Sequence, residues 1–404
     1  MLTVAEALKQ IQESLSPIAP ESVPITEAHQ RICRQELRAR ENSPLFDNSA
    51  MDGYALKAED TLSASKTAPV SLKIIDKIPA GTIASSELSA GEACRIFTGA
   101  PTPKGANAVI MQEDTEVQGD IVAIHREVAC KENVRFAGED ITTDEILYES
   151  GDVLDAGAIG VLAAQGFTEI LVGPKPKVAV IPTGDEIVEL GQKLEPGQIR
   201  NSNAHMLAAQ IERSGANATQ GAIACDTLDA LRQTLNESAK GSDLIITCGG
   251  VSVGEFDLVR NIVESEGQKV FWKVAVKPGK PLLFGYFRDT PLIGLPGNPV
   301  SAFVCFELFV RPAIEKLMGE KQNQNQFCSA TLTQSVKPNK KRTEYLRGVY
   351  QIKNGEACVE PHFKQGSGHL RSITHINTLI EIPPGNEVLQ TGTRVKIIIL
   401  KIGK

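Results

Sequence analysis

The sequence has no long hydrophobic run, few aromatic residues and no paired-cysteine motif. No uninterrupted apolar stretch is long enough to cross a bilayer, so a helical membrane protein is excluded. The first ten residues carry Glu6 and Lys9 in a helical pattern, without the basic start and apolar core of a secretion signal. We therefore expect a cytoplasmic protein that does not act at a membrane.

The cysteines and histidines form no metal-binding pattern. None of the eight cysteines belongs to a C-x-x-C pair, and Cys248 and Cys305 have apolar neighbours. Buried free thiols in a reducing compartment are the simplest interpretation. The six scattered histidines lack the spacing of a zinc site.

Charge is unevenly distributed along the chain. The net charge is -7, yet residues 328–404 hold 12 Lys/Arg and 5 Asp/Glu, a net charge of +7. A basic segment attached to an acidic remainder indicates a local anion site. Because basic and aromatic residues do not interleave, the pattern does not favour a nucleic-acid partner.

The chain is too long for one ordinary core, and its patterns change along its length. Residues 3–16 predict an amphipathic helix with a Thr3–Glu6 capping box, and residues 151–168 a second helix ending near Gly166. Short β-like runs such as 70–75 and 108–111 follow the first helix. From residue 174 strands alternate with helices, which predicts βαβ units and a parallel sheet. The expected strands are 178–181, 219–224, 244–247, 270–274, 282–286 and 292–295, and the expected helices are 205–213, 228–239, 258–266 and 300–318.

We therefore expect a multidomain α/β protein with four domains. Residues 1–43 and 137–173 form an N-terminal helical and extended domain, and 44–136 a small β-rich domain. Residues 174–326 form the parallel-sheet α/β domain. Short alternating strands at 330–335, 346–352, 379–382 and 394–402 predict a C-terminal β-barrel over 327–404.

A glycine loop after a buried strand is the strongest local motif. Leu244–Asp257 reads LIITCGGVSVGEFD, and Gly249, Gly250, Ser252 and Gly254 lie between a strand and a helix. Such glycines let backbone N–H groups approach a phosphate at a helix N-terminus. A tight strand-to-helix turn with Asp257 as the helix cap explains the same residues.

Two further motifs follow the glycine loop. Lys273, Lys277 and Lys280 cluster in FWKVAVKPGKP, and the first two face the same side if the strand continues. They suit a polyanionic ligand, although lysines also protect a solvated edge strand. GLPGNPVS, with Pro296 and Pro299, predicts a rigid turn whose Asn298 or Ser301 caps the next helix.

Acidic and hydroxyl residues stand in several short motifs. Asp52 lies in FDNSAMDGY, Thr98 in RIFTGAP and Asp140 in GED. Each is also explained as a turn residue or a cap. Glu186 ends PTGDE at a strand's carboxyl end, where an Asp-Glu pair is a candidate for Mg²⁺. Carboxylates, lysines and a glycine loop at strand ends together indicate metal-assisted chemistry on a phosphorylated ligand.

These motifs occur in the same order in a known family. FDNSAMDGYA, RIFTGAP, GEDI, PTGDE, GGVSVGEFD, KPGKP and GLPGNPVSA together resemble the molybdopterin molybdenumtransferases, the family that includes the C-terminal domain of gephyrin. The resemblance covers essentially the whole chain. It implies an elongated homodimer with the active site shared between subunits, a molybdopterin-binding α/β domain and a C-terminal β-barrel.

The resemblance also implies a reaction and roles for residues. Adenylylated molybdopterin receives molybdenum from molybdate with Mg²⁺, and AMP is released. The implied catalytic residues are Asp52, Thr98, Asp140, Glu186, Asp226 and Asp257, with Glu186 and Asp257 on the metal. The implied substrate-binding residues are Gly249, Gly250, Ser252, Gly254, Lys273, Lys277, Lys280, Pro296, Pro299, Arg347 and a serine, Ser367 or Ser372.

Two other functions fit part of the sequence. The molybdopterin adenylyltransferases resemble only the α/β domain, and they are also a possible contact partner of this family. Gephyrin uses its related domain as a non-catalytic scaffold. The DNSAMDGYA segment and the basic barrel favour the transferase over the adenylyltransferase, and because the sequence shows no extra scaffold domain or long linker, we do not expect a scaffold.

Overall fold

The structure, a computed structural model, describes residues 1–251, 258–321 and 327–400. The chain divides into two compact units. One comprises Met1–Gln35, Ser150–Gly160 and Thr168–Lys404, and the other comprises Glu36–Glu149 and Val161–Phe167. The expected fold class, a multidomain α/β protein, is confirmed, and each unit is described separately below.

The second unit is built on a six-stranded mixed sheet with the order β7-β4-β6-β5-β9-β8. Gly53 lies in β4, which pairs with β6 on one side and β7 on the other. Only glycine fits there, because a Cβ would stand 1.8 Å from the Ile110 carbonyl oxygen. The β-rich expectation is therefore correct, and Gly53 belongs to a crowded strand rather than to a turn. The strands are β4 (Gly53–Leu56), β5 (Val70–Ile78), β6 (Glu92–Ile96), β7 (Ala108–Met111), β8 (Thr115–Gln118) and β9 (Ile121–Ile124), with short pairs β2 (Leu37–Arg38) with β11 (Ile146–Tyr148) and β3 (Asn48–Ser49) with β10 (Val134–Arg135).

The first helix follows its sequence pattern closely. Helix α1 (Val4–Ser14) starts at Thr3, whose hydroxyl accepts from the Glu6 amide while the Glu6 carboxylate accepts from the Thr3 amide. The second helix, α2 (Ala156–Ala164), is shorter than expected, because the Asp155 carboxylate accepts the Ala158 N–H and starts the helix there. Strand β1 (Glu21–Pro24) pairs with β12 (Glu169–Val172).

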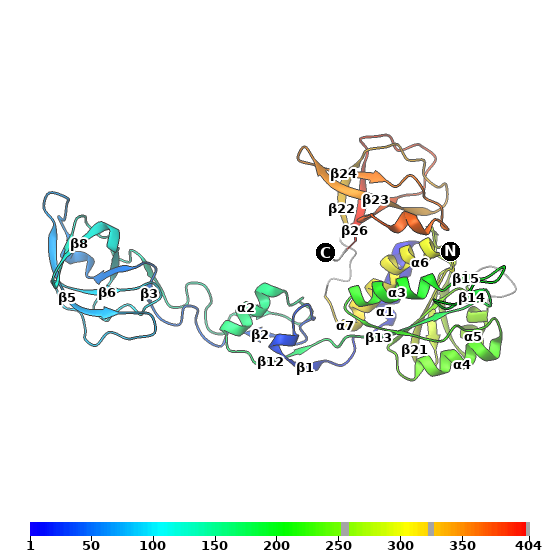
Figure 1. Ribbon diagram of the computed structural model, residues 1–404, viewed down its shortest axis with the longest axis horizontal. Coiled ribbons are helices and arrows are strands. Elements are labelled where there is room, and N and C mark those ends of the chain that lie inside the picture. The colour runs from blue at the N-terminus through cyan, green and yellow to red at the C-terminus, as the bar shows by residue number, and fades with distance from the viewer. Residues whose placement is uncertain (252–257, 322–326, 401–404) are drawn as a thin grey trace. The chain divides into compact units, whose positions relative to one another are not determined.

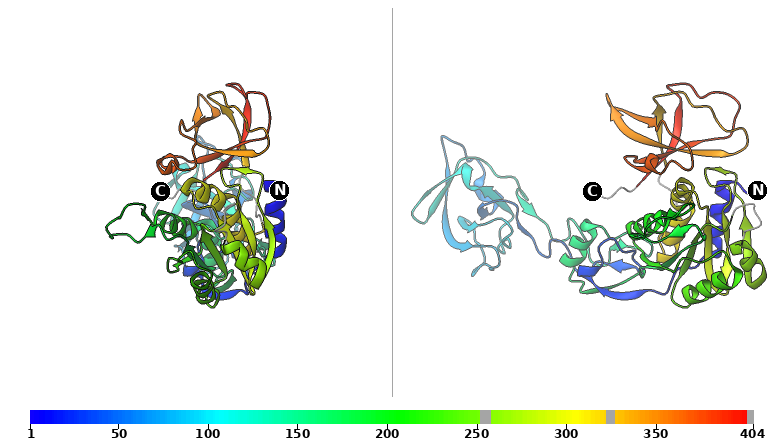
Figure 2. Two further views of the ribbon diagram at one scale, coloured as in Figure 1. Left: turned by 90° about the vertical axis from the view of Figure 1, so that its right-hand side faces the viewer. Right: turned by 45° about the vertical axis from the view of Figure 1, so that its right-hand side comes forward.

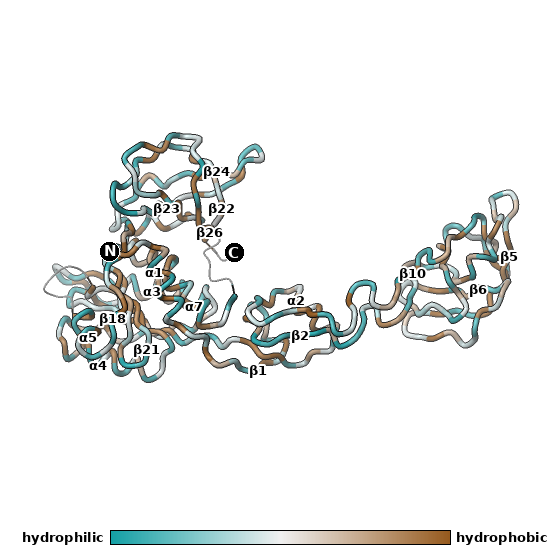
Figure 3. The backbone as a smooth tube through the Cα atoms, turned by 180° about the vertical axis from the view of Figure 1, so that it is seen from behind, coloured by the Kyte–Doolittle hydropathy of each residue, from teal (hydrophilic) through white to brown (hydrophobic). Residues whose placement is uncertain are grey.

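The first unit contains a six-stranded sheet with the order β16-β13-β17-β21-β20-β18. Its hydrophobic inner strands are covered on both faces (Figures 1 and 3). Helices α1, α3 (Ser202–Arg213), α6 (Pro299–Cys305) and α7 (Arg311–Met318) supply one core, and α4 (Leu228–Ala239) and α5 (Leu258–Glu266) the other. The strands are β13 (Lys177–Pro182), β16 (Asn217–Gln220), β17 (Leu244–Cys248), β18 (Gly267–Trp272), β20 (Leu283–Phe287) and β21 (Thr290–Leu295).

The expected parallel sheet is present, and one antiparallel strand near its edge makes the whole sheet mixed. Strands β16, β13, β17 and β21 are parallel, whereas β20 is antiparallel to both β21 and β18. Only Arg288 and Asp289 separate β20 from β21, and a two-residue connection can join only antiparallel strands. Arg288 has a φ of 53°, as such a tight turn requires.

The expected helix 300–318 is continuous but not α-helical throughout. A π-helical turn, Phe306–Val310, separates α6 from α7. Glu307 in this turn is 1% exposed. Its carboxylate accepts hydrogen bonds from Gln210 at 2.7 Å and from Arg213, both on α3, and pairs with Arg311 Nε at 3.4 Å. These contacts fasten the long helix to α3.

The C-terminal segment forms a closed five-stranded ring. Its strands are β22 (Phe327–Leu332), β23 (Thr343–Lys353), β24 (Glu356–Pro361), β25 (Thr378–Ile382) and β26 (Arg394–Ile399). They pair in the order β23-β24-β22-β26-β25, and β23–β25 pairing closes the ring (Figure 2). The barrel expectation is confirmed, although β24 did not stand out in the sequence. Two-residue β19 (Val276–Lys277) joins the barrel through β23.

All eight cysteines are free thiols, as expected. Cys33, Cys94, Cys248 and Cys305 are buried, whereas Cys130 and Cys225 are exposed, so burial holds for only part of the set. Within the described ranges, no helix combines the length and apolar character needed to span a membrane.

We predict that Glu307→Ala lowers the free energy of unfolding by about 3 kcal/mol, because it removes the buried counter-charge of Arg213 and one of two carboxylates that pair with Arg311. Urea unfolding measures the change. Glu237→Ala, at an exposed position on α4, is the matched control and should change stability by less than about 0.5 kcal/mol. Equal effects of the two substitutions would show that the buried network adds no stability.

Candidate functional site

Three strand ends are held in register at one edge of the α/β sheet. Pro182 at the end of β13 pairs with Cys248 at the end of β17, and Cys248 pairs with Leu295 at the end of β21. The three loops that follow therefore leave the sheet side by side. These are the PTGDE, CGG and LPGNP motifs, which lie far apart in the sequence. Open α/β sheets bind ligands at this kind of edge.

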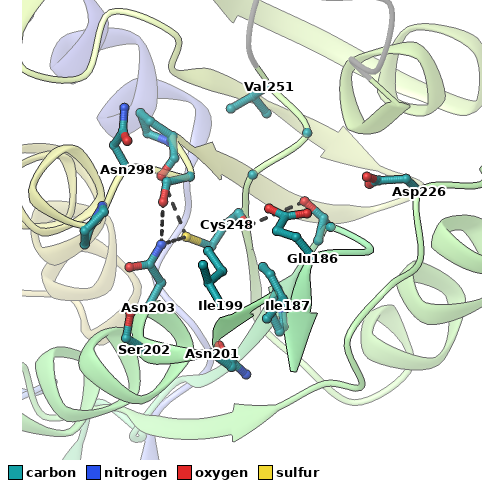
Figure 4. A pocket seen from close by; sticks show the side chains of 18 of the residues that line it. Glu186, Ile187, Ile199, Asn201, Ser202, Asn203, Asp226, Cys248, Val251 and Asn298 are labelled. Atoms are coloured by element: carbon teal, nitrogen blue, oxygen red, sulfur yellow. Dashed lines mark hydrogen bonds between the residues drawn. The ribbon is translucent and has the colours of Figure 1, made fainter. Parts of the chain in front are cut away.

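A pocket of about 800 Å³ opens between these loops (Figure 4). Its size suits a ligand of several hundred daltons. Carboxylates, amides, backbone groups and small apolar residues share the wall. The lining residues include Thr183, Gly184, Glu186, Asn201, Asn203, Asp226, Cys248, Gly249, Gly250, Pro296, Asn298 and Pro299.

Asn203 and Cys248 fasten the back of the pocket. The Asn203 amide donates to the Gly297 carbonyl at 2.6 Å and to Cys248 Sγ at 3.2 Å, and the thiol lies 3.7 Å from the Pro296 carbonyl (Figure 4). Burial raises the pKa of the Cys248 thiol to about 12, so the sulfur stays neutral and is not a nucleophile at neutral pH. Its role in the pocket is to hold the proline turn beside β17.

The two described loop glycines are required by close packing. Gly249 has a φ of 110°, and a Cβ there would lie 2.5 Å from Thr183 Oγ1. Gly250 has a φ of 65°, and a Cβ there would lie 2.8 Å from a Val259 methyl. The tight-turn explanation therefore holds for both glycines, and both also line the pocket, as the ligand explanation expects. Ser252, Gly254 and Asp257 lie outside the described residues.

Two carboxylates line the pocket. Glu186 follows β13, and Asp226 follows the segment in which Ala224 bridges Thr183 (Figure 4). The Asp226 amide donates to the Asp185 carboxylate at 3.0 Å, so Asp185 organises this loop. No group of three His, Cys, Asp or Glu that could hold a metal occurs within the described ranges. Two carboxylates nevertheless fit Mg²⁺, which usually takes one or two from the protein and its other oxygens from substrate and water.

The three predicted lysines have separate environments. Strand β18 ends at Trp272, and Lys273 has a φ of 73°, so the condition for Lys273 and Lys277 to share a face is not met. Lys273 Nζ lies 3.5 Å from the centroid of the Trp272 ring, whose indole N–H donates to the Val251 carbonyl of the glycine loop. Lys277 pairs with Glu344 at 2.9 Å. Lys280 is exposed next to Pro281, a pocket residue.

Arg347 and the two candidate serines lie in and beside the barrel. Arg347 is fully buried, and burial lowers the pKa of its guanidinium to about 10. It donates to the Ser372 hydroxyl at 3.0 Å and to the carbonyls of residues 364–366. The Ser367 carbonyl accepts the Val300 amide at 3.2 Å, which joins this loop to the start of α6. Ser372 is thus the serine in contact with Arg347, and Ser367 the one beside the pocket helix.

Asp52, Thr98 and Asp140 belong to the other unit. The Asp52 carboxylate accepts from both the amide and the hydroxyl of Thr98 at 2.8 Å, and these bonds hold the pKa of Asp52 below its usual range. The structure thus brings together two residues that the sequence analysis named separately, Asp52 and Thr98. Asp140 is exposed, and its amide donates to the Ser43 carbonyl.

Sequence reasoning missed three residues of the site. Asn201, Asn203 and Trp272 were not singled out, although the first two line the pocket and Trp272 contacts the glycine loop. Asn201 caps α3 by accepting the Ala204 amide. An asparagine just before a helical pattern is the signal that could have found it. Asn203 and Trp272 carry no comparable signal.

Comparison with known proteins places the whole chain in one family. Family models match residues 2–166 (MoeA N-terminal region, domains I and II), 179–316 (probable molybdopterin binding domain) and 329–400 (MoeA C-terminal region, domain IV). A Mycobacterium tuberculosis protein named molybdopterin molybdenumtransferase 2 is 36% identical, covering 98% of this chain and 99% of the relative. A Staphylococcus aureus molybdopterin molybdenumtransferase is 34% identical, covering 98% and 95%.

Comparison with solved structures leads to the same family. The MoeA protein of Pyrococcus horikoshii OT3 matches with a TM-score of 0.86 and 32% identity, covering 99% of this chain and all of the other. The α/β domain with its pocket and the C-terminal barrel thus have the fold of a class of molybdenum-cofactor biosynthesis proteins. The chain belongs to the MoeA family of molybdopterin molybdenumtransferases.

We predict that Thr98→Val raises the pKa of Asp52 toward its ordinary value, because the carboxylate loses a hydroxyl donor that stabilises its charged form. Titration of the Asp52 carboxyl carbon by NMR measures the shift. Thr115→Val, which removes a hydroxyl bonded to a backbone carbonyl, is the control and should leave that titration unchanged. An unshifted Asp52 in Thr98→Val would contradict the bond seen here.

Proposed function

We propose that this protein inserts molybdenum from molybdate into adenylylated molybdopterin and releases AMP. The observation that carries the proposal is the pocket at the three aligned strand ends, within a chain that matches named molybdenumtransferases over its full length. Hydrolysis of the phosphoanhydride, with water as the attacking group, gives AMP and the pterin phosphate, and molybdenum joins the dithiolene sulfurs. The free thiols fit the cytoplasm, where we place the protein.

The pocket residues have distinct tasks in this proposal. The backbone N–H of Gly250 approaches a phosphate oxygen, whereas the N–H of Gly249 already donates to the Leu295 carbonyl at 3.0 Å. Glu186 and Asp226 would hold Mg²⁺, which offsets the charge of the phosphates when it is bound. The rigid proline turn keeps the opposite wall in place, because Asn203 and Cys248 fasten it.

We predict that Glu186→Ala lowers the rate of molybdenum insertion at least about 100-fold, even at saturating Mg²⁺. The reason is that the substitution removes a carboxylate that lines the pocket. Molybdenum in the product and AMP release are the measurements, and urea unfolding verifies that the variant is folded. Glu195→Ala, at an exposed position that does not line the pocket, is the control. Normal turnover by Glu186→Ala would refute the metal role.

We further propose a homodimer in which each site takes Asp52 from one subunit and Glu186 from the other. The supporting observation is that the ordered Asp52–Thr98 pair is exposed and belongs to a different unit from the pocket. A two-fold dimer makes two equivalent shared sites.

Mixing two inactive variants tests the shared site. We expect Asp52→Ala and Glu186→Ala homodimers to be inactive, whereas their heterodimers contain one intact site and one doubly defective site. At equal mixing with random exchange, about one quarter of the parent's sites recover. Native mass spectrometry follows exchange. Complete exchange without recovered activity would place both residues in a same-chain site.

The second candidate function is adenylylation of molybdopterin itself, since a pocket of this kind also suits a nucleotide. The same assay separates the two, because that activity consumes ATP and makes the adenylate instead of using it. The adenylyltransferase is also a proposed contact partner, since it would supply the substrate.

A further inference from the structure

An aromatic pair, half-buried His362 and exposed Phe363, lies on the loop between β24 and η5 (Leu370–Ile373). Phe363 is 83% exposed, and its ring stacks on that of His362 with centroids 4.6 Å apart and an angle of 22° between the planes. Lys364 Nζ lies 5.5 Å from the centroid of the Phe363 ring. A single exposed phenylalanine is ordinary on a protein surface. The anchoring and position of this one are what indicate a role.

The loop that carries the pair is fixed to the barrel. Gln365 donates to the carbonyls of Arg347 and His362 and accepts the Arg347 amide. The His362 amide donates to the Arg347 carbonyl at 2.8 Å, and the buried guanidinium holds the carbonyl of Lys364. The backbone is thus bonded on both sides of Phe363. A ring presented on a fixed backbone loses little entropy when it binds.

The same loop reaches the rim of the pocket. The Ser367 carbonyl accepts the amide of Val300, the neighbour of Pro299 in the pocket wall. Ser367 is four positions after Phe363 in the chain, so their Cα atoms are at most about 14 Å apart. Figure 1 shows the barrel's short helix, η5, beside α6, which it contacts. Phe363 is therefore within reach of a ligand that extends from the pocket.

We propose that His362 and Phe363 form a stacking platform for a fused heteroaromatic ring of the substrate. The inference rests on the proposed function, whose substrate carries two such rings, a pterin and an adenine, joined through phosphates. One ring system occupies the pocket and the other lies on Phe363, with Lys364 close enough to attract a phosphate. A flat π face next to a cation is better suited to bind such a ring than to bind an acidic surface of a partner protein.

Titration calorimetry on the full-length protein tests the platform with three probes: AMP, 6-hydroxymethylpterin and ribose 5-phosphate. Loss of a base-stacking aromatic typically weakens binding roughly 5- to 150-fold. We expect Phe363→Ala to weaken one ring-bearing probe at least about five-fold within that range. Ribose 5-phosphate, which has no ring system, should bind as it does to the parent.

Two further variants control the result. Phe363→Trp keeps a stacking face and should restore binding of the affected probe. Ile352→Ala removes another largely exposed apolar side chain, 69% accessible, from β23 and should change nothing. The affected probe identifies which ring, adenine or pterin, lies on the platform.

The outcomes separate this inference from the proposed function. If the parent binds AMP and the pterin, and Phe363→Ala binds both equally well, the platform is refuted while the transferase proposal stands. If the parent binds neither ring probe, both proposals fall. If Phe363→Ala alters only the sedimentation coefficient, the ring is a self-association contact and the platform is likewise refuted.

Discussion

The register of three parallel strands is the constraint on which the pocket depends. Pro182, Cys248 and Leu295 are neighbours across the sheet, so three loops separated by dozens of residues start from one line. A one-residue slip of β17 would turn its side chains to the opposite face and carry the CGG loop out of line with the other two. Burial on both faces makes such a slip costly, because all five residues of β17 are buried. The hydrophobic core thus determines where the polar groups meet.

Close packing then fixes the loops themselves. Gly249 and Gly250 allow the backbone to pass against Thr183 and Val259, where any side chain would collide. The neutral Cys248 thiol and the Asn203 amide join the proline turn to this backbone. None of these groups needs to react. They remove freedom from the walls before a ligand arrives, which lowers the entropy lost on binding.

The sequence predicted local structure well and contacts between distant segments poorly. The Thr3–Glu6 capping box and helix α5 are found where their patterns placed them, because caps and periodicity are local. The antiparallel edge of the sheet was missed, since strand direction depends on a two-residue turn that does not alter periodicity. The Lys277–Glu344 pair and the Asn203 contacts join separate segments, so no local pattern could reveal them. The order of the motifs indicated which residues belong to the site but not the hydrogen bonds and ion pairs that they form.

The charges around the pocket impose a last requirement. Glu186 and Asp226 line it, and Arg200 is the one lysine or arginine among its described lining residues. A carboxylate and a phosphate 4 Å apart repel by about 4 kcal/mol at a surface dielectric near 20. An anionic ligand therefore enters only if positive charge comes with it or lies nearby. Lys273 lies over the Trp272 ring and Lys277 pairs with Glu344, so both lysines attract a ligand anion less strongly than free lysines would. A divalent cation that binds both carboxylates and phosphate would turn this repulsion into the attachment point of the ligand.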